Sequence, residues 1–180
     1  LKTVTGGITY GYDGRGRRVT RTAGGITKRW LYDGQLRVVA EYENDVLKKR
    51  FVYASRANVP DTMLDVASGV TYRYLTDQLG SVRAVVNARG AAASILNYDA
   101  WGNVLGTSTN VTFQPFGFAG GIYDATVGFV HFGARDYDPA TGGLDLDGLA
   151  RKLSARTAAI YIETPSYAGI IESRAAEIAA

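Results

Sequence analysis

His131 is the only histidine in this chain of 180 residues, which contains no cysteine. A lone imidazole can act as a general base, but nucleophilic catalysis also needs an activated nucleophile, and no serine elbow is present. A metal site would have only carboxylates to add to it. We therefore predict no catalytic residue, metal site or cofactor. His131 is interpreted as a polar residue of a strand, on the same face as Phe129 and opposite Phe132.

The other candidates for chemistry are aspartates, but each stands where a turn is expected. Asp13, Asp33, Asp77 and Asp99 each follow a strand-like, aromatic-rich stretch and are followed by glycine within three residues. An aspartate at that place accepts backbone N–H groups two residues on, while glycine supplies the left-handed conformation that closes the turn. Backbone capping therefore accounts for these carboxylates.

The elements that carry these turns form a tandem repeat. Successive units are spaced by roughly twenty residues, a period that signals a repeat architecture. Each unit reads as a strand and a tight turn, and Thr71-Tyr-Arg-Tyr74 shows the alternation that puts aromatic rings on one face. We expect the tyrosine hydroxyls to stay near water. The repeat-motif residues are Tyr12, Asp13 and Gly16; Tyr32 and Asp33; Tyr74, Asp77 and Gly80; and Tyr98, Asp99 and Gly102.

These units resemble the tyrosine-aspartate (YD) repeats of Rhs proteins and teneurins. The stretches Tyr74-Leu-Thr-Asp-Gln-Leu-Gly-Ser-Val-Arg83 and Phe132-Gly-Ala-Arg-Asp-Tyr-Asp-Pro-Ala-Thr-Gly142 are similar to the repeat-associated core that ends bacterial Rhs shells. The resemblance divides the region into YD repeats at 1–71 and a core at 72–142. It implies an antiparallel β-sheet spiral that encloses a C-terminal toxin, with an upstream YD-repeat shell and that toxin as partners.

Residues 143–180 change in pattern. Leu146, Leu149 and Leu153 share one face of a helix, and an apolar strand and an alanine-rich helix follow, which gives an α–β–α order. This tail resembles a piece of the first subunit of the glycine-cleavage decarboxylase, a pyridoxal-phosphate enzyme. Lys152 does not match the Schiff-base lysine, so we interpret the tail as an inactive fragment. A gene fusion, a frameshift, an assembly artefact and a deliberate chimera remain open. The predicted fold is mainly β with a short α/β-like tail.

The resemblance suggests one reaction, which is self-cleavage. Rhs cores are similar to aspartyl proteases in using two carboxylates that share a proton, both within Asp-Pro motifs. In the family these motifs follow the element that is here Tyr137 to Gly142, and neither is present: Gly148 stands ten residues beyond Asp138, where the next Asp-Pro would fall. We therefore expect no autoproteolysis and interpret Asp138 as a turn residue.

Charge and hydropathy restrict the partners. The net charge is +3, with the densest cluster at Arg15, Arg17, Arg18 and Arg21. Interleaved charges on a solvated sheet face account for it, so we predict no nucleic-acid partner. No apolar run long enough to span a membrane is present, and the N-terminus shows no signal pattern. Membership of an Rhs protein would imply a secreted or cell-surface location.

Three functions follow, in order of preference. The first is a structural encapsulation module, the terminal part of a toxin-delivery shell. The second is a module that binds glycans or a cell surface through its tyrosine-rich sheet, and the third is the decarboxylase fragment.

We also expect open sheet edges to promote association. The tail should dock weakly and be cut first between Gly142 and Arg151.

Overall fold

The computed structural model describes residues 2–4, 7–34, 36–133 and 135–140. The predicted tail at 143–180 and its junction at Gly142 lie outside the described residues. The described part contains two antiparallel sheets and one short 3-10 helix. The first sheet consists of β1 (Lys2–Val4), β2 (Ile8–Tyr12), β3 (Arg18–Ala23), β4 (Ile26–Asp33), β5 (Arg37–Glu43), β6 (Val46–Val52), β7 (Thr62–Asp65), β8 (Thr71–Thr76), β9 (Val82–Asn87) and β10 (Ala92–Ile95). The second consists of β11 (Ile122–Asp124), β12 (Phe129–Phe132) and β13 (Arg135–Tyr137), preceded by η1 (Phe118–Gly120).

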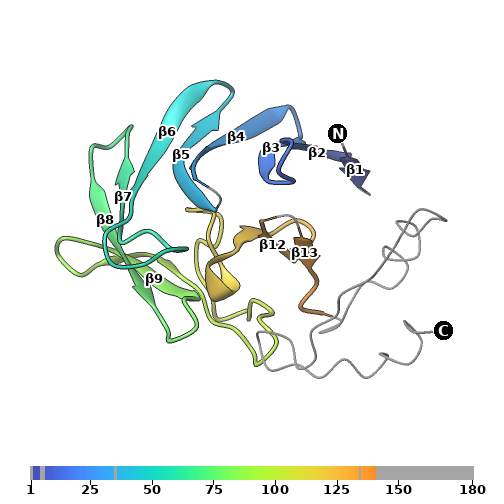
Figure 1. The fold of residues 1–180 in the computed structure, drawn as a ribbon. Coiled ribbons are helices and arrows are strands. Elements are labelled where there is room, and N and C mark those ends of the chain that lie inside the picture. Colours follow the sequence, from blue (N-terminus) through green and yellow to red (C-terminus); the bar gives the residue numbers. More distant parts are fainter. Residues whose placement is uncertain (1, 5–6, 35, 134, 141–180) are drawn as a thin grey trace.

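The ten-stranded sheet is a meander in which every strand pairs with the next one in sequence. Tight turns make this order possible, because an antiparallel neighbour needs only a short connection. The sheet continues across the 71/72 boundary, since β7 pairs with β8. Figure 1 shows that it curves into an arc. The prediction of a mainly β, antiparallel fold is confirmed.

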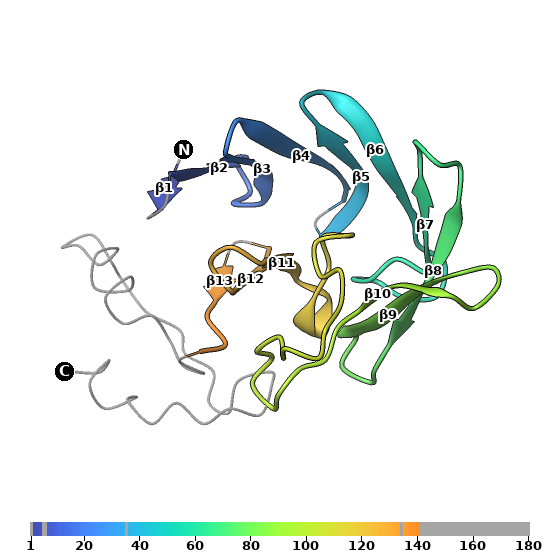
Figure 2. The ribbon, with the colours of Figure 1, turned by 180° about the vertical axis from the view of Figure 1, so that it is seen from behind.

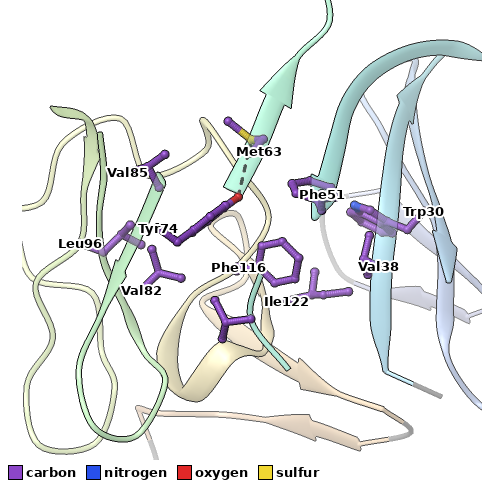
Figure 3. Close-up of a cluster of buried hydrophobic side chains, with 11 residues drawn as sticks. Trp30, Val38, Phe51, Met63, Tyr74, Val82, Val85, Leu96, Phe116 and Ile122 are labelled. Carbon is purple, nitrogen blue, oxygen red and sulfur yellow. Dashed lines mark hydrogen bonds between the residues drawn. The ribbon is translucent and has the colours of Figure 1, made fainter. Parts of the chain in front are cut away.

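The three-stranded sheet lies inside this arc (Figures 1 and 2). The chain therefore passes along ten strands and then returns into the concave side of its own sheet. Phe116, just ahead of η1, packs edge-on against Phe51 and Tyr74, with ring centroids 5.1 and 5.8 Å apart. Figure 3 shows these rings meeting between the arc and the returning segment. The buried cluster consists of Trp30, Val38, Phe51, Val59, Met63, Tyr74, Val82, Val85, Leu96, Phe116 and Ile122.

Alternation along the strands selects the residues that reach this core. Tyr72 and Tyr74 lie on one face, as predicted, and the structure turns that face inward, where Tyr72 packs against Phe113 with ring centroids 5.1 Å apart. The expectation that the hydroxyls stay near water was wrong for Tyr74, which is buried and donates its hydroxyl to the sulfur of Met63 at 3.6 Å. The returning segment covers the concave face and removes these rings from solvent. Within the described residues, no helix is long and apolar enough to cross a membrane.

Candidate functional site

The repeat turns share one hydrogen-bonding pattern. In each, a side-chain oxygen accepts the backbone N–H groups of the residues two and four positions on. The distances are 2.9 and 3.0 Å at Asp13, 3.0 and 2.9 Å at Asp77, and 2.8 and 3.0 Å at Asp99. The capping role predicted for these three aspartates agrees with this geometry. Asp33 ends β4 and pairs in register with Arg37.

One further turn of this kind was missed from the sequence. Asn87 accepts the N–H groups of Arg89 and Ala91 at 2.9 and 3.0 Å. The sequence did contain a signal for this turn, because Gly90 follows Asn87 by three positions. Glycine closes these turns because it adopts positive φ without strain. The angle is 78° at Gly16, 84° at Gly80 and 93° at Gly102.

Tyrosine hydroxyls connect each repeat to the one before it. Each of three tyrosines donates its hydroxyl to a backbone carbonyl that follows the turn of the preceding unit, and an arginine of that unit lies over its ring. Tyr32 bonds Arg18 O at 2.8 Å, Tyr53 bonds Val38 O at 2.9 Å and Tyr98 bonds Val82 O at 3.0 Å. The covering arginines are Arg17, Arg37 and Arg83, at 4.8, 5.7 and 5.5 Å from the ring centroids. We call these three bonds the hydroxyl ladder.

Tyr12 occupies the corresponding place in the first unit but completes no such bond. Its hydroxyl is buried and has no acceptor among the described residues. Its ring lies 5.9 Å from the His131 ring. Tyr74, the remaining predicted motif tyrosine, belongs to the core instead of the ladder. Tyr53 is a ladder member that the sequence motif did not identify, because neither an aspartate nor a glycine follows it closely.

A buried polar seam joins β2 and β3 to the three-stranded sheet. Its first half centres on Arg18, which is 1 % exposed and stacks over the Tyr10 ring at 4.1 Å. The Arg18 guanidinium pairs with Asp136 at 2.7 Å. Its backbone N–H donates to His131 Nε2 at 3.2 Å, and His131 Nδ1 lies 2.8 Å from the same Asp136 oxygen.

Asp124 holds the second half of the seam together. Arg21 Nε and the Tyr10 hydroxyl each donate to Asp124 Oδ2 at 2.6 Å. Arg21 also donates to Thr126 at 2.7 Å. Burial disfavours the ionised form of Asp124, but the hydrogen bonds from Arg21 and Tyr10 outweigh burial and lower its pKa. Burial, followed by the bond to Asp124, raises the pKa of Tyr10.

The position of His131 favours a structural role. Because Nε2 accepts a backbone N–H, we assign the ring proton to Nδ1, directed at Asp136. A general base needs its acceptor nitrogen available to substrate, whereas this nitrogen is occupied and the side chain is 2 % exposed. The described residues contain no group of three or more potential metal ligands. No sequence signal predicted the seam, since its partners lie more than a hundred positions apart.

The neighbourhood of Asp138 agrees with a turn. Asp138 Oδ1 accepts the Ala140 N–H at 2.9 Å. Asn103 Nδ2 bridges Asp99 Oδ2 at 2.8 Å and the Pro139 carbonyl at 3.0 Å, which attaches this turn to the preceding repeat. The bond from Asn103 is the main cause that lowers the pKa of Asp99.

Comparison with known proteins gives one family. The family model described as Teneurin YD-shell matches residues 2–147. The tRNA3(Ser)-specific nuclease WapA of Bacillus spizizenii is 31% identical over 138 residues, which cover 74% of this chain and 6% of that protein. Teneurin-1 of Gallus gallus is 31% identical over 140 residues, covering 75% of this chain and 5% of that protein. The chain thus spans only a small part of these relatives.

Solved structures show the same fold. The crystal structure of TcdB2-TccC3-TEV aligns with a TM-score of 0.52 at 20% identity, over 79% of this chain and 8% of that chain. The Photorhabdus luminescens Tc holotoxin pore with mutation TccC3-D651A gives a TM-score of 0.52 at 18% identity, over 77% of this chain and 8% of that chain. At this identity the likeness concerns the fold alone.

Proposed function

Because this chain belongs to the Teneurin YD-shell family, we propose that it is a structural, non-catalytic module of a larger β-sheet shell that encloses a C-terminal toxin or effector. One observation carries the proposal. The three-stranded sheet, which leads into the C-terminal part of the chain, lies inside the arc formed by the ten-stranded sheet. From this placement we infer that a toxin following β13 in the chain would begin within the shell.

The seam supports a stable closure of this kind. Two ion pairs, Arg18 with Asp136 and Arg21 with Asp124, connect β3 to β13 and β11 across more than a hundred positions. Breaking a buried pair by removing one partner costs about 3 to 5 kcal/mol, so each pair resists separation of the two sheets. The apolar cluster around Phe116 adds a second, independent attachment.

Tyr12 supports an upstream repeat as partner. The ladder acceptors precede their tyrosines by 14 positions (32 − 18), 15 positions (53 − 38) and 16 positions (98 − 82). A preceding repeat packed beside β1 would supply the carbonyl that the buried Tyr12 hydroxyl lacks. A shell made of many repeats would contain such a neighbour.

The relatives support a proposal for the cargo and the location. Relatives from Bacillus spizizenii and Bacillus subtilis are named as tRNA nucleases. By analogy, the enclosed partner here would be a toxin carried C-terminal to the shell, and the assembled protein would be secreted or displayed at the cell surface. The chain's own residues would provide the enclosure and not the toxic activity.

A protection experiment tests the proposal. The chain is placed after a block of YD repeats from a relative and before a protease-sensitive reporter domain, and the product is treated with protease. We expect a hollow particle by electron microscopy and a protected reporter, with protection lost in Arg18→Glu. A reporter that is cut equally fast with and without the repeat block would refute enclosure. Self-cleavage detected by mass spectrometry would refute the non-catalytic assignment.

A further inference from the structure

His131 connects the two sheets through its ring nitrogens. It lies on β12 of the three-stranded sheet, and its Nε2 accepts the backbone N–H of Arg18, the first residue of β3, at 3.2 Å. Its Nδ1 lies 2.8 Å from Oδ1 of Asp136 on β13, and the Arg18 guanidinium reaches the same oxygen at 2.7 Å. The bond through Nε2 requires a neutral ring, because a protonated imidazole has two donors and no acceptor nitrogen.

The surroundings of His131 are rich in hydrogen-bond donors. From β2, Tyr12 faces it with ring centroids 5.9 Å apart, and the Tyr12 hydroxyl has no partner among the described residues. From β3, Arg18 brings Nε and Nη1, which have none there either. From β13, Asp136 supplies a carboxylate, and the β11 residue opposite His131 in register is the uncharged Ile122. Conversion of His131 from an acceptor to a donor would therefore add one more unpaired donor, the Arg18 N–H, to this buried place.

We propose that His131 is a pH-sensitive latch between the two sheets, closed when its ring is neutral and loosened when the ring is protonated in mild acid. Asp136 offsets the lost bond only in part, because its Oδ1 already pairs with the Arg18 guanidinium, which is 1% exposed and repels a second cation. The latch is a property of the contact between the sheets and does not depend on what they enclose.

The loosening should appear as a loss of stability in mild acid. Proton uptake by the folded protein breaks the bond between His131 and Arg18, whereas the unfolded chain has no such bond to lose. Stability therefore decreases as the pH falls through about 8 to 5, where histidine ordinarily changes charge. His131 is the only histidine and cysteine is absent, so no other side chain of ordinary pKa titrates in this range. Asp124, whose pKa lies below 3.8, responds only to stronger acid.

Urea denaturation of the full chain at pH 7.5 and at pH 5.5 tests the latch. We expect the equilibrium constant for folding of the unchanged protein to be at least about threefold lower at pH 5.5, with about tenfold per pH unit as the limit for one proton. The variant His131→Gln should change less than about twofold, because its amide oxygen can accept the Arg18 N–H at both pH values.

Nitrogen-15 NMR of the His131 ring gives a second readout that needs no variant. At pH 7.5 we expect an unprotonated Nε2 and a protonated Nδ1, and the Arg18 amide signal should shift in step as the ring is titrated. A protonated Nε2 at pH 7.5, equal stability of the unchanged protein at the two pH values, or an equal loss in His131→Gln would each overturn the proposal. The chain alone is measured, so the result is independent of whether a shell encloses a reporter.

Discussion

In three of the repeats, the tyrosine contributes through its hydroxyl as well as its ring. In the hydroxyl ladder, one end of the side chain is fixed by a backbone carbonyl and the ring is covered by an arginine of the preceding unit. Because the acceptor is a main-chain carbonyl, the bond depends on strand register and not on the acceptor's side chain. Arg18 and Val82 therefore serve equally well.

Removing one ladder hydroxyl should lower stability without disturbing the ring. Tyr98→Phe leaves the Val82 carbonyl unpaired in a partly buried place, and we expect a loss of about 1 kcal/mol in the free energy of unfolding. Urea denaturation measures it. The control is Tyr42→Phe, because Tyr42 also carries an arginine over its ring but makes no hydroxyl bond among the described residues. Equal losses in the two variants would contradict the ladder.

Asp124 should make the seam sensitive to strong acid. Hydrogen bonds from Arg21 and Tyr10 exceed the effect of burial and hold the pKa of Asp124 below its ordinary 3.8. Its contribution to stability is therefore complete above pH 3.8 and is lost as pH falls through the lower pKa of the folded state.

Replacement of Asp124 by asparagine tests this dependence. We expect Asp124→Asn to lose about 3 kcal/mol at neutral pH, because Arg21 then lacks its buried counter-ion. The difference from the unchanged protein should shrink as the pH falls below 3.8 in denaturation curves. Asp45→Asn is the control, since Asp45 is 88% exposed and its pair with Arg29 should contribute little. A difference that stays constant with pH would rule out Asp124 as the acid-sensitive group.

At the scale of elements, the glycine of a repeat turn meets two requirements: a backbone with positive φ and, in one turn, close approach of a neighbouring side chain. Gly102 has positive φ, and a methyl group there would lie 2.5 Å from the Phe118 ring of η1. Gly90 also has positive φ, at 79°, but has nothing within 4 Å of that position. Comparing a substitution at Gly90 with one at Gly102 therefore distinguishes the cost of backbone strain from the cost of close packing.

Alanine at these two glycines should have unequal effects. Gly90→Ala should cost about 1 kcal/mol from strain alone. Gly102→Ala should cost about 3 kcal/mol, because displacement of Phe118 adds an overpacking penalty. Thermal and urea unfolding of the two variants give the comparison, and near-ultraviolet circular dichroism should change only for Gly102→Ala. Equal costs would mean that η1 adjusts freely.

At the scale of the whole molecule, β1 is an edge of the ten-stranded sheet within the described residues. An unpaired edge presents backbone donors and acceptors to other chains. We expect the isolated chain to self-associate with increasing concentration in sedimentation velocity. A charged residue introduced on the edge strand β1 should reduce this association, because charge on an edge strand opposes pairing. A sharply unfolding monomer at every concentration would contradict the prediction.

The sequence by itself determined the local units. Tyrosine, aspartate and glycine at fixed offsets identified the turns at Asp13, Asp77 and Asp99, because capping and positive φ depend on residues only a few positions apart. Alternation also predicted that Tyr72 and Tyr74 share a face. These features were predictable because their causes are local in the chain.

Only the tertiary structure decided what the units enclose. The return of Phe116 into the arc buried the Tyr74 hydroxyl that was expected near water, and it brought Asp124 and Asp136 to Arg21 and Arg18. The role of His131 likewise depends on a backbone N–H from β3. The contacts of the seam join residues more than a hundred positions apart, and Phe116 follows Tyr74 by 42 positions (116 − 74). No periodicity in one sequence records which face of a sheet such a distant segment will cover.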